Sequence, residues 1–86
     1  MKVNPSGDHA QVLDQRGRLC PLPVIALATC AQGLRDGEVI VLLADDPAAQ
    51  YDIPAWCGMR GHHVAPPIPS SDGHGMAYRV TIGSTS

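Results

Sequence analysis

The sequence contains no phenylalanine, one tryptophan and two tyrosines, so aromatic residues make up only 3% of its 86 residues. Basic residues are also scarce, since there are six Lys and Arg and no two of them are adjacent. A protein whose main task is to hold nucleic acid needs a dense field of positive charge. No apolar run approaches the roughly 18 residues that cross a membrane. The sequence therefore predicts neither direct binding to nucleic acid nor a membrane partner.

Paired cysteines are missing as well. Cys20, Cys30 and Cys57 cannot all pair within one chain, and none lies in a Cys-x-x-Cys pair. A disulfide-stapled secreted scaffold has a denser, even-numbered set. The stretch from Arg16 to Ala31 faintly imitates a secretion signal, but acidic residues precede it and two prolines open its apolar part. We therefore expect a cytoplasmic protein with at least one free thiol.

What is present is the composition of a small globular protein. Residues of the AVILMFWYC set make up 44% of the chain, charged residues 16%, and the formal net charge is −2. A chain of 9.0 kDa suits one core between two layers of secondary structure. We expect a single domain over residues 10–83, a flexible N-terminal arm over residues 1–9 and a tail over residues 84–86.

Hydrophobic periodicity and turn residues predict the elements of this domain. Pro54 is expected to interrupt a longer second helix, so that helix is placed after a short turn at Pro47. The prolines at 66 and 67 close a strand that belongs at a sheet edge. The expected order is strand 11–15, helix 23–34, strand 38–44, helix 52–60, strand 62–65, loop 69–75 and strand 76–82. This β-α-β-α-β-β order predicts an α/β two-layer sandwich, in which a four-stranded mixed sheet carries both helices on one face.

The segment with chemistry in it is Cys-Pro-Leu-Pro at residues 20–23, directly before the first predicted helix. Pro23 suits the first helical position, which places Leu22 at the N-cap with no oxygen to offer the helix donors. A sulfur anion on Cys20 can then turn toward the free N–H groups of Val24, Ile25 and Ala26, which lowers the thiol pKa. The alternative is a buried cysteine that only fills space. The residues alone leave both interpretations open.

The segment around Cys20 resembles the L-D-x-R-G-x-x-C-P-x-P segment of the TusA/SirA-like sulfur carrier family. It reads Asp-Gln-Arg-Gly-Arg-Leu-Cys-Pro-Leu-Pro at residues 14–23. Residues 44–49, 52–57 and 61–62 resemble a second block of that family at the same separation. The resemblance implies the same fold and a persulfide carried on Cys20, with no separate cofactor. It also implies supporting roles for Arg16, Gly17, Pro21 and Pro23.

The same resemblance implies two kinds of partner, a sulfur donor of the cysteine desulfurase or rhodanese type and a sulfur acceptor protein. The relays that such carriers serve are tRNA thiolation, sulfur oxidation and cofactor biosynthesis. Transfer from protein to protein gives the chain the character of a sulfurtransferase.

The chain departs from the family in the residues around the cysteine. Relatives often have Glu where Leu22 stands, and basic residues along the first helix, where this chain has Ala26, Thr29 and Gln32. We therefore expect an unusually apolar docking surface, made of Arg18, Leu19, Leu22 and Ile25. Arg16 and Arg18 either lend positive potential to an anionic persulfide or are ordinary solvated arginines.

Two other functions compete with a sulfur carrier. A thiol-redox protein needs a resolving cysteine, and only Cys30 and Cys57 are available. Cys30 lies about two helical turns beyond Cys20, on the order of 10 Å away and beyond disulfide reach. The second alternative is a regulatory or interaction module that has the fold without the chemistry.

The remaining candidate residues have simpler interpretations. Trp56 and Cys57 share an apolar helix face and are expected in the core, while Cys30 is expected to fill space. Asp45 and Asp46 are expected to cap a helix rather than form an acid/base pair. No metal site is expected, because adjacent histidines on a strand point to opposite faces and the third lies in a loop. The candidate ligands considered are His62, His63 and His74, together with Cys57.

Overall fold

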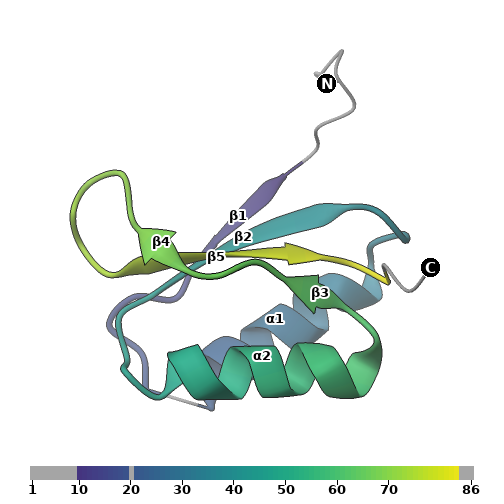
Figure 1. The fold of residues 1–86 in the computed structure, drawn as a ribbon, viewed down its shortest axis with the longest axis horizontal. Coiled ribbons are helices and arrows are strands. Elements are labelled where there is room, and N and C mark those ends of the chain that lie inside the picture. The colour runs from purple at the N-terminus through teal and green to yellow at the C-terminus, as the bar shows by residue number, and fades with distance from the viewer. Residues whose placement is uncertain (1–9, 20, 84–86) are drawn as a thin grey trace.

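The computed structural model describes residues 10–19 and 21–83, so the expected arm, Cys20 and the tail lie outside the described residues. These described residues form two helices and five strands (Figure 1). In chain order they are β1 (Gln11–Asp14), α1 (Leu22–Gln32), β2 (Val39–Ala44), α2 (Ala49–Arg60), β3 (His63–Val64), β4 (Ile68–Pro69) and β5 (Met76–Thr81).

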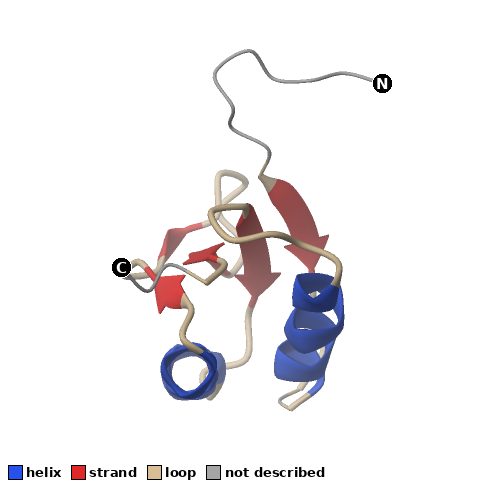
Figure 2. Ribbon diagram, turned by 90° about the vertical axis from the view of Figure 1, so that its right-hand side faces the viewer, coloured by secondary structure: helices blue, strands red, loops and turns tan. Residues whose placement is uncertain are grey.

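All five strands belong to one mixed sheet, in the order β1-β2-β5-β3, with β4 also paired to β5. β1 and β2 run parallel because α1 crosses between them, and the other pairs are antiparallel. Both helices lie on the same face of this sheet, as Figures 1 and 2 show. The predicted two-layer α/β sandwich with a mixed sheet is thus confirmed.

The fifth strand, β4, was not expected from the sequence. β3 and β4 pair with the same side of β5, at Thr81 and Val80 for β3 and at Ala77 and Met76 for β4. Between them lie Pro66 and Pro67, which have no N–H to donate. The two prolines therefore divide one edge strand into two short pieces, and the expected loop begins after Pro69 rather than at it.

The core lies between the helices and the sheet. β2 sends Ile40, Leu42 and Ala44 into it, while the alternate residues on the opposite face stay partly exposed. Trp56 and Cys57 are buried on α2, as the helical spacing predicted. The remaining buried apolar residues are Leu27, Ala49, Ile53, Tyr78, Val80 and Ile82.

The second helix begins three residues earlier than expected, and Pro54 lies inside it. In a helix the missing N–H of Pro54 would have bonded the carbonyl of Gln50, and both of these residues are exposed. The early start buries Ala49 and Ile53 completely. Burying an Ile side chain is worth about 1.5–3 kcal/mol, the same scale as the cost of an internal proline. Packing therefore decides where α2 begins.

Neither α1 nor α2 is long and apolar enough to cross a membrane, in the part of the chain that the structure describes. The expected location in the cytoplasm stays a prediction.

Two glycines of α2 should respond oppositely to the same substitution. Gly58 is exposed in the helix, and a Cβ there would meet no atom within 4 Å, so Gly58→Ala should raise the free energy of unfolding by roughly 0.5–1 kcal/mol. Gly61 ends the helix in the left-handed conformation at φ 76°, so Gly61→Ala should lower it by about 1–2 kcal/mol. Urea unfolding of both variants measures this. Equal shifts in the same direction would contradict the role of Gly61 as a helix cap.

Candidate functional site

The loop from β1 to α1 holds the Cys-Pro-Leu-Pro segment, and it lies at the end of the sheet where β1 and β2 both finish. Cys20 is outside the described residues, but Leu19 before it and Pro21 after it are described. The N–H of Leu22 donates to the carbonyl of Leu19 over 2.9 Å, at the point where the loop enters α1.

The start of α1 differs by one residue from the prediction. Pro21 is the N-cap, Leu22 is the first helical residue and Pro23, which is buried, is the second. The N–H of Ile25 donates to Pro21 over 2.9 Å, and that of Leu22 donates to Leu19. Neither is therefore available to a sulfur anion. Ala26 is the fifth residue of α1, so its N–H bonds within the helix, and of the three expected donors only Val24 is left at the open first turn. Among residues 10–19 and 21–83, no side chain caps the helix and no acidic residue lies in its first turn, so the positive end of the helix dipole is not neutralised by these residues.

Arg16 fits neither of the two interpretations offered by the sequence, because its guanidinium group is held between two carboxylates. Its Nη2 lies 2.7 Å from Asp14 Oδ2, and its Nε donates to Asp14 Oδ1 over 3.0 Å. Its Nη1 lies 2.7 Å from Asp72 Oδ2 and also donates to the carbonyl of His74 over 3.1 Å. Arg16 thus ties the end of β1 to the loop between β4 and β5, 56 residues further along the chain.

A second set of hydrogen bonds holds Gly17, the next residue of the loop. The N–H of Gly17 lies 3.0 Å from both carboxylate oxygens of Asp45, and His74 Nε2 lies 3.3 Å from Asp45 Oδ2. Asp45 is thus an anchor for the loop rather than a helix cap. Asp46 does accept the N–H of Ala48 over 3.1 Å, as a capping residue would, but in the turn before α2.

Gly75 lets the β4–β5 loop pass close to Arg16 and Asp45. Its φ is +80°, and a Cβ there would lie 2.9 Å from the carbonyl oxygen of Ala44 and 3.3 Å from both Arg16 Cδ and Asp45 Cβ. Any larger residue would push the β4–β5 loop away from the loop that leads to Cys20.

The carboxyl groups that bind Arg16 and Gly17 have lowered pKa values. Hydrogen bonds from Arg16 lower the pKa of Asp14 from 3.8 to about 2. Hydrogen bonds from Arg16, the His74 N–H and the Ser70 hydroxyl lower the pKa of Asp72 further. The N–H of Gly17 is the main cause of the lowered pKa of Asp45. All three carboxylates are therefore ionised at neutral pH.

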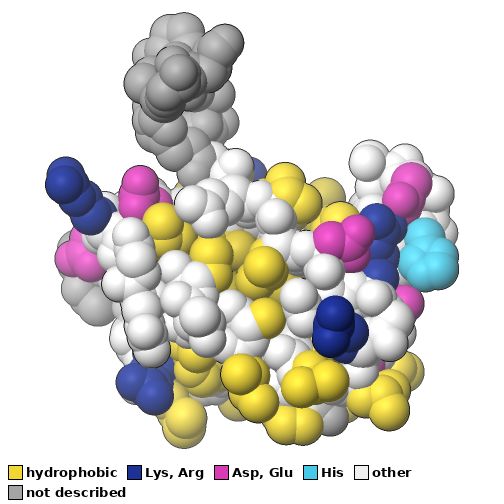
Figure 3. Space-filling model, turned by 180° about the vertical axis from the view of Figure 1, so that it is seen from behind, with side chains coloured by type: hydrophobic (Ala, Val, Ile, Leu, Met, Phe, Trp, Pro, Cys, Tyr) yellow, Lys and Arg dark blue, Asp and Glu magenta, His cyan; other side chains and the backbone are white. Residues whose placement is uncertain are grey.

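The residues expected to form a docking surface are exposed beside this loop. Exposed fractions are 72% for Leu19, 47% for Leu22 and 55% for Ile25, and Arg18 is exposed as well. Figure 3 shows hydrophobic side chains along the helix layer at the lower edge of the molecule, with charged side chains and a histidine gathered above them at one end.

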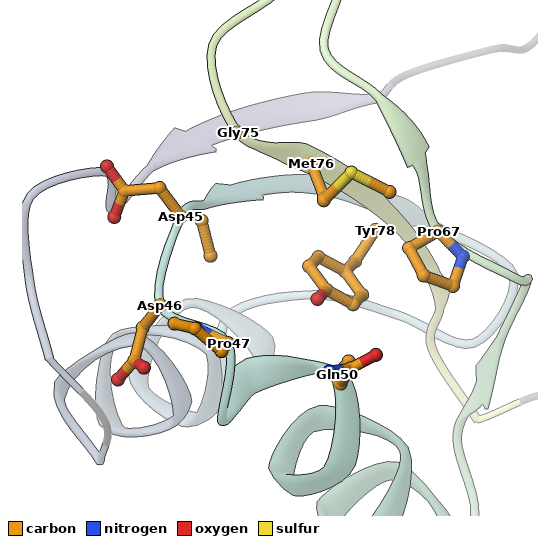
Figure 4. Close-up of a pocket in the computed structure, with 9 residues that line it drawn as sticks. Asp45, Asp46, Pro47, Gln50, Pro67, Gly75, Met76 and Tyr78 are labelled. Atoms are coloured by element: carbon orange, nitrogen blue, oxygen red, sulfur yellow. The ribbon is translucent and has the colours of Figure 1, made fainter.

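A pocket of about 360 Å³ opens next to the anchor of Gly17, between the start of α2 and β5 (Figure 4). Asp45 and Asp46 lie on its side nearest the loop from β1, and Met76 and Tyr78 lie opposite. Its other lining residues are Ala44, Pro47, Gln50, Pro67 and Gly75.

The other cysteines have structural roles, as predicted. Cys57 is buried, and burial raises the pKa of its thiol to about 11. Cys30 packs against the core from the side, and its Sγ donates to Gln11 Oε1 over 3.2 Å.

His62 and His74 have different partners, and that of His74 is Asp45. His62 lies 5.0 Å from the ring of Trp56, and its Nδ1 accepts the N–H of Gly83. Over residues 10–19 and 21–83, no three His, Cys, Asp or Glu residues gather closely enough to hold a metal ion.

Sequence reasoning missed the contribution of the β4–β5 loop. Asp72, His74 and Gly75 read as ordinary loop residues, since nothing in a linear pattern reveals a partner 56 positions away. The available signal was Arg16 itself, since an arginine in a loop can pair with an acidic residue and the neighbouring sequence offers only Asp14.

The pKa shift of Asp14 predicts how stability depends on pH. A folded-state pKa of about 2, against an ordinary value of 3.8, gives a stabilisation that is present above about pH 4 and is lost as the pH falls through 2. The lowered pKa of Asp72 acts in the same direction. Asp72→Asn should therefore shrink the difference in urea midpoint between pH 7 and pH 3, whereas Ser71→Asn, beside it in the loop, should keep it. An undiminished difference in Asp72→Asn would contradict the ion pair with Arg16.

Comparison with known proteins identifies a similar fold and a matching family. The chain resembles the SirA-like protein from Desulfitobacterium hafniense, with a TM-score of 0.71 and 20% sequence identity, over 85% of this chain and 97% of that one. That likeness concerns the fold. The model of the family described as "Sulfurtransferase TusA" matches residues 11–81, which include β1, the anchored loop, both helices and β5. The chain therefore belongs to the TusA family of sulfur carrier and sulfurtransferase-type proteins.

Proposed function

We propose that this protein carries sulfur as a persulfide on Cys20, taking it from a donor protein and passing it to an acceptor protein. The observation that carries the proposal is the family match over residues 11–81, which includes an intact Cys-Pro-Leu-Pro segment at the start of α1. The relay is one of tRNA thiolation, sulfur oxidation or cofactor biosynthesis. Cys20 itself holds the sulfur, so no separate cofactor is needed.

The chemistry is two successive displacements at sulfur. The Cys20 thiolate attacks the outer sulfur of a cysteine persulfide on the donor, the donor's S–S bond breaks, and the donor cysteine leaves as a thiolate. A nucleophile of the acceptor then attacks the outer sulfur on Cys20, and the Cys20 thiolate leaves. The electrons balance in each displacement without an external oxidant or reductant.

Two features of the described residues support a reactive thiol at position 20. The uncapped start of α1, with no acidic residue in its first turn, favours an anion in the preceding loop. The hydrogen bonds of Arg16 and Gly17 fix the chain before Cys20, and Pro21 and Pro23 restrict the backbone after it. Little conformational entropy is therefore lost when a partner docks. These four residues therefore support the site without reacting.

The docking surface is proposed as Arg18, Leu19, Leu22 and Ile25. A persulfide must be delivered directly to an acceptor, so the partner has to cover the residues around Cys20. The exposed apolar side chains of Leu19, Leu22 and Ile25 provide the kind of desolvated centre that transient interfaces use.

Mass spectrometry tests the proposal. After incubation with a cysteine desulfurase and L-cysteine, or with a rhodanese and thiosulfate, the protein should gain about 32 Da, the mass of one sulfur atom. Cys20→Ser should abolish the gain, while Cys30→Ala and Cys57→Ala should keep it.

The other outcomes identify the competing functions. Loading that survives Cys20→Ser would disprove the assignment of the sulfur to Cys20. A loss of about 2 Da would indicate an internal disulfide and a thiol-redox protein. An unchanged mass with both donors would indicate a non-catalytic interaction module.

A further inference from the structure

Resting on the proposed carrier function, we infer that the partner protein docks on the start of α1 with a surface that is basic around an apolar centre. The apolar part of the argument is the exposed row Leu22 and Ile25, which lie three positions apart on one face of α1. The row continues through Thr29, which is exposed and uncharged. Because α1 carries no charged residue, the sign of the surface is set by the loops around it.

Those loops are acidic. The end of the sheet that carries the site has four carboxylates, from Asp14, Asp45, Asp46 and Asp72, and two guanidinium groups, from Arg16 and Arg18. Their sum is −2, which equals the formal net charge of the whole sequence. The other charged residues that the structure describes are three arginines and three acidic residues, whose formal charges cancel, so the excess negative charge of the described residues lies at this end of the sheet.

The carboxylates around Arg16 are also more exposed than its guanidinium group. The side chain of Arg16 is 19% exposed, whereas Asp14 and Asp72, which flank it, are 51% and 55% exposed, and Asp45 is 30% exposed. An approaching protein therefore meets these carboxylates before the guanidinium group of Arg16, while the exposed Arg18 leaves one positive charge beside them. Figure 3 shows this charged end directly above the hydrophobic edge.

The acidic loops and the apolar row are close enough for one partner to cover both. Gly17 is bonded to Asp45, and Leu19 follows two residues later, a span of at most about 7 Å. On the other side of Asp45, the pocket between α2 and β5 offers Pro47 and Met76. The aliphatic stem of a partner's lysine or arginine can lie against these residues while its charged head remains near the acidic rim.

A pair of designed peptides tests the inference on the full chain. One is an amphipathic helix of leucine and lysine, and the other has glutamate in place of every lysine. In NMR titrations the leucine–lysine peptide should shift the amide signals of Leu19, Leu22 and Ile25. Raising NaCl from about 50 to about 300 mM should weaken its binding by about tenfold, because exposed charges are screened. The leucine–glutamate peptide should leave these signals in place.

A matched pair of charge variants tests the position of the surface. Thr29→Glu should tighten binding of the leucine–lysine peptide several-fold, and Thr29→Lys should weaken it to a similar extent. The same two changes at Met59, which is 77% exposed near the far end of α2, should have much smaller effects (Figure 1).

Three outcomes would overturn the inference: equal or tighter binding of the leucine–glutamate peptide, tighter binding in Thr29→Lys, or shifts confined to the opposite face of the sheet. Persulfide loading separates this from the proposed function. Loading without binding of the leucine–lysine peptide would refute the basic partner and leave the carrier function intact. Binding without loading by either donor would refute the carrier function and leave the basic docking surface intact.

Discussion

The structure around the site depends on one guanidinium group held between two carboxylates. Arg16 is bonded at once to Asp14, two residues before it, and to Asp72, in the loop between β4 and β5. Because the interaction joins the first strand to the last hairpin, the loop that leads to Cys20 is positioned by a segment far away in the sequence. Isolated ion pairs on a surface contribute little to stability. The value of this one is geometric, since planar Arg–carboxylate contacts fix both distance and direction.

Gly75 and Asp45 follow from the same constraint. Once Arg16 and Asp72 draw the two loops together, the chain at residue 75 passes so close to the carbonyl of Ala44 that only glycine fits. Asp45, which follows β2 directly, then lies where it can accept the N–H of Gly17. Three segments, from the ends of β1 and β2 and from the β4–β5 loop, thereby support one short loop. The chemistry proposed for Cys20 needs such a frame, because a carried sulfur has to be presented in a defined position.

The contacts of Arg16 with Asp14 and Asp72 also determine the distribution of charge around the site. Two arginines in the loop before Cys20 suggest a positive environment, yet the side chain of Arg16 is less exposed than its two carboxylate partners. With an uncharged α1, the surface that a partner meets is apolar in the middle and acidic at the edge. Membership of the TusA family implies interaction with sulfur donors and acceptors in general. The charge distribution is what distinguishes the partners suited to this chain.

The sequence by itself determined the α/β class, the order of the main elements and the core. The helical spacing of Trp56 and Cys57 and the apolar run of β2 can be satisfied only by burial on one side. The prolines around Cys20 left a reactive and a space-filling cysteine equally open, and only the resemblance to the TusA/SirA-like family favoured the reactive one. Tertiary structure decided what local rules leave open. Burial of Ile53 favours a helix that begins before Pro54. The edge of β5 pairs with β4 beyond the two prolines. Asp72 binds Arg16, which lies 56 residues away in the sequence. Such contacts form only after the chain has folded, so no local pattern encodes them.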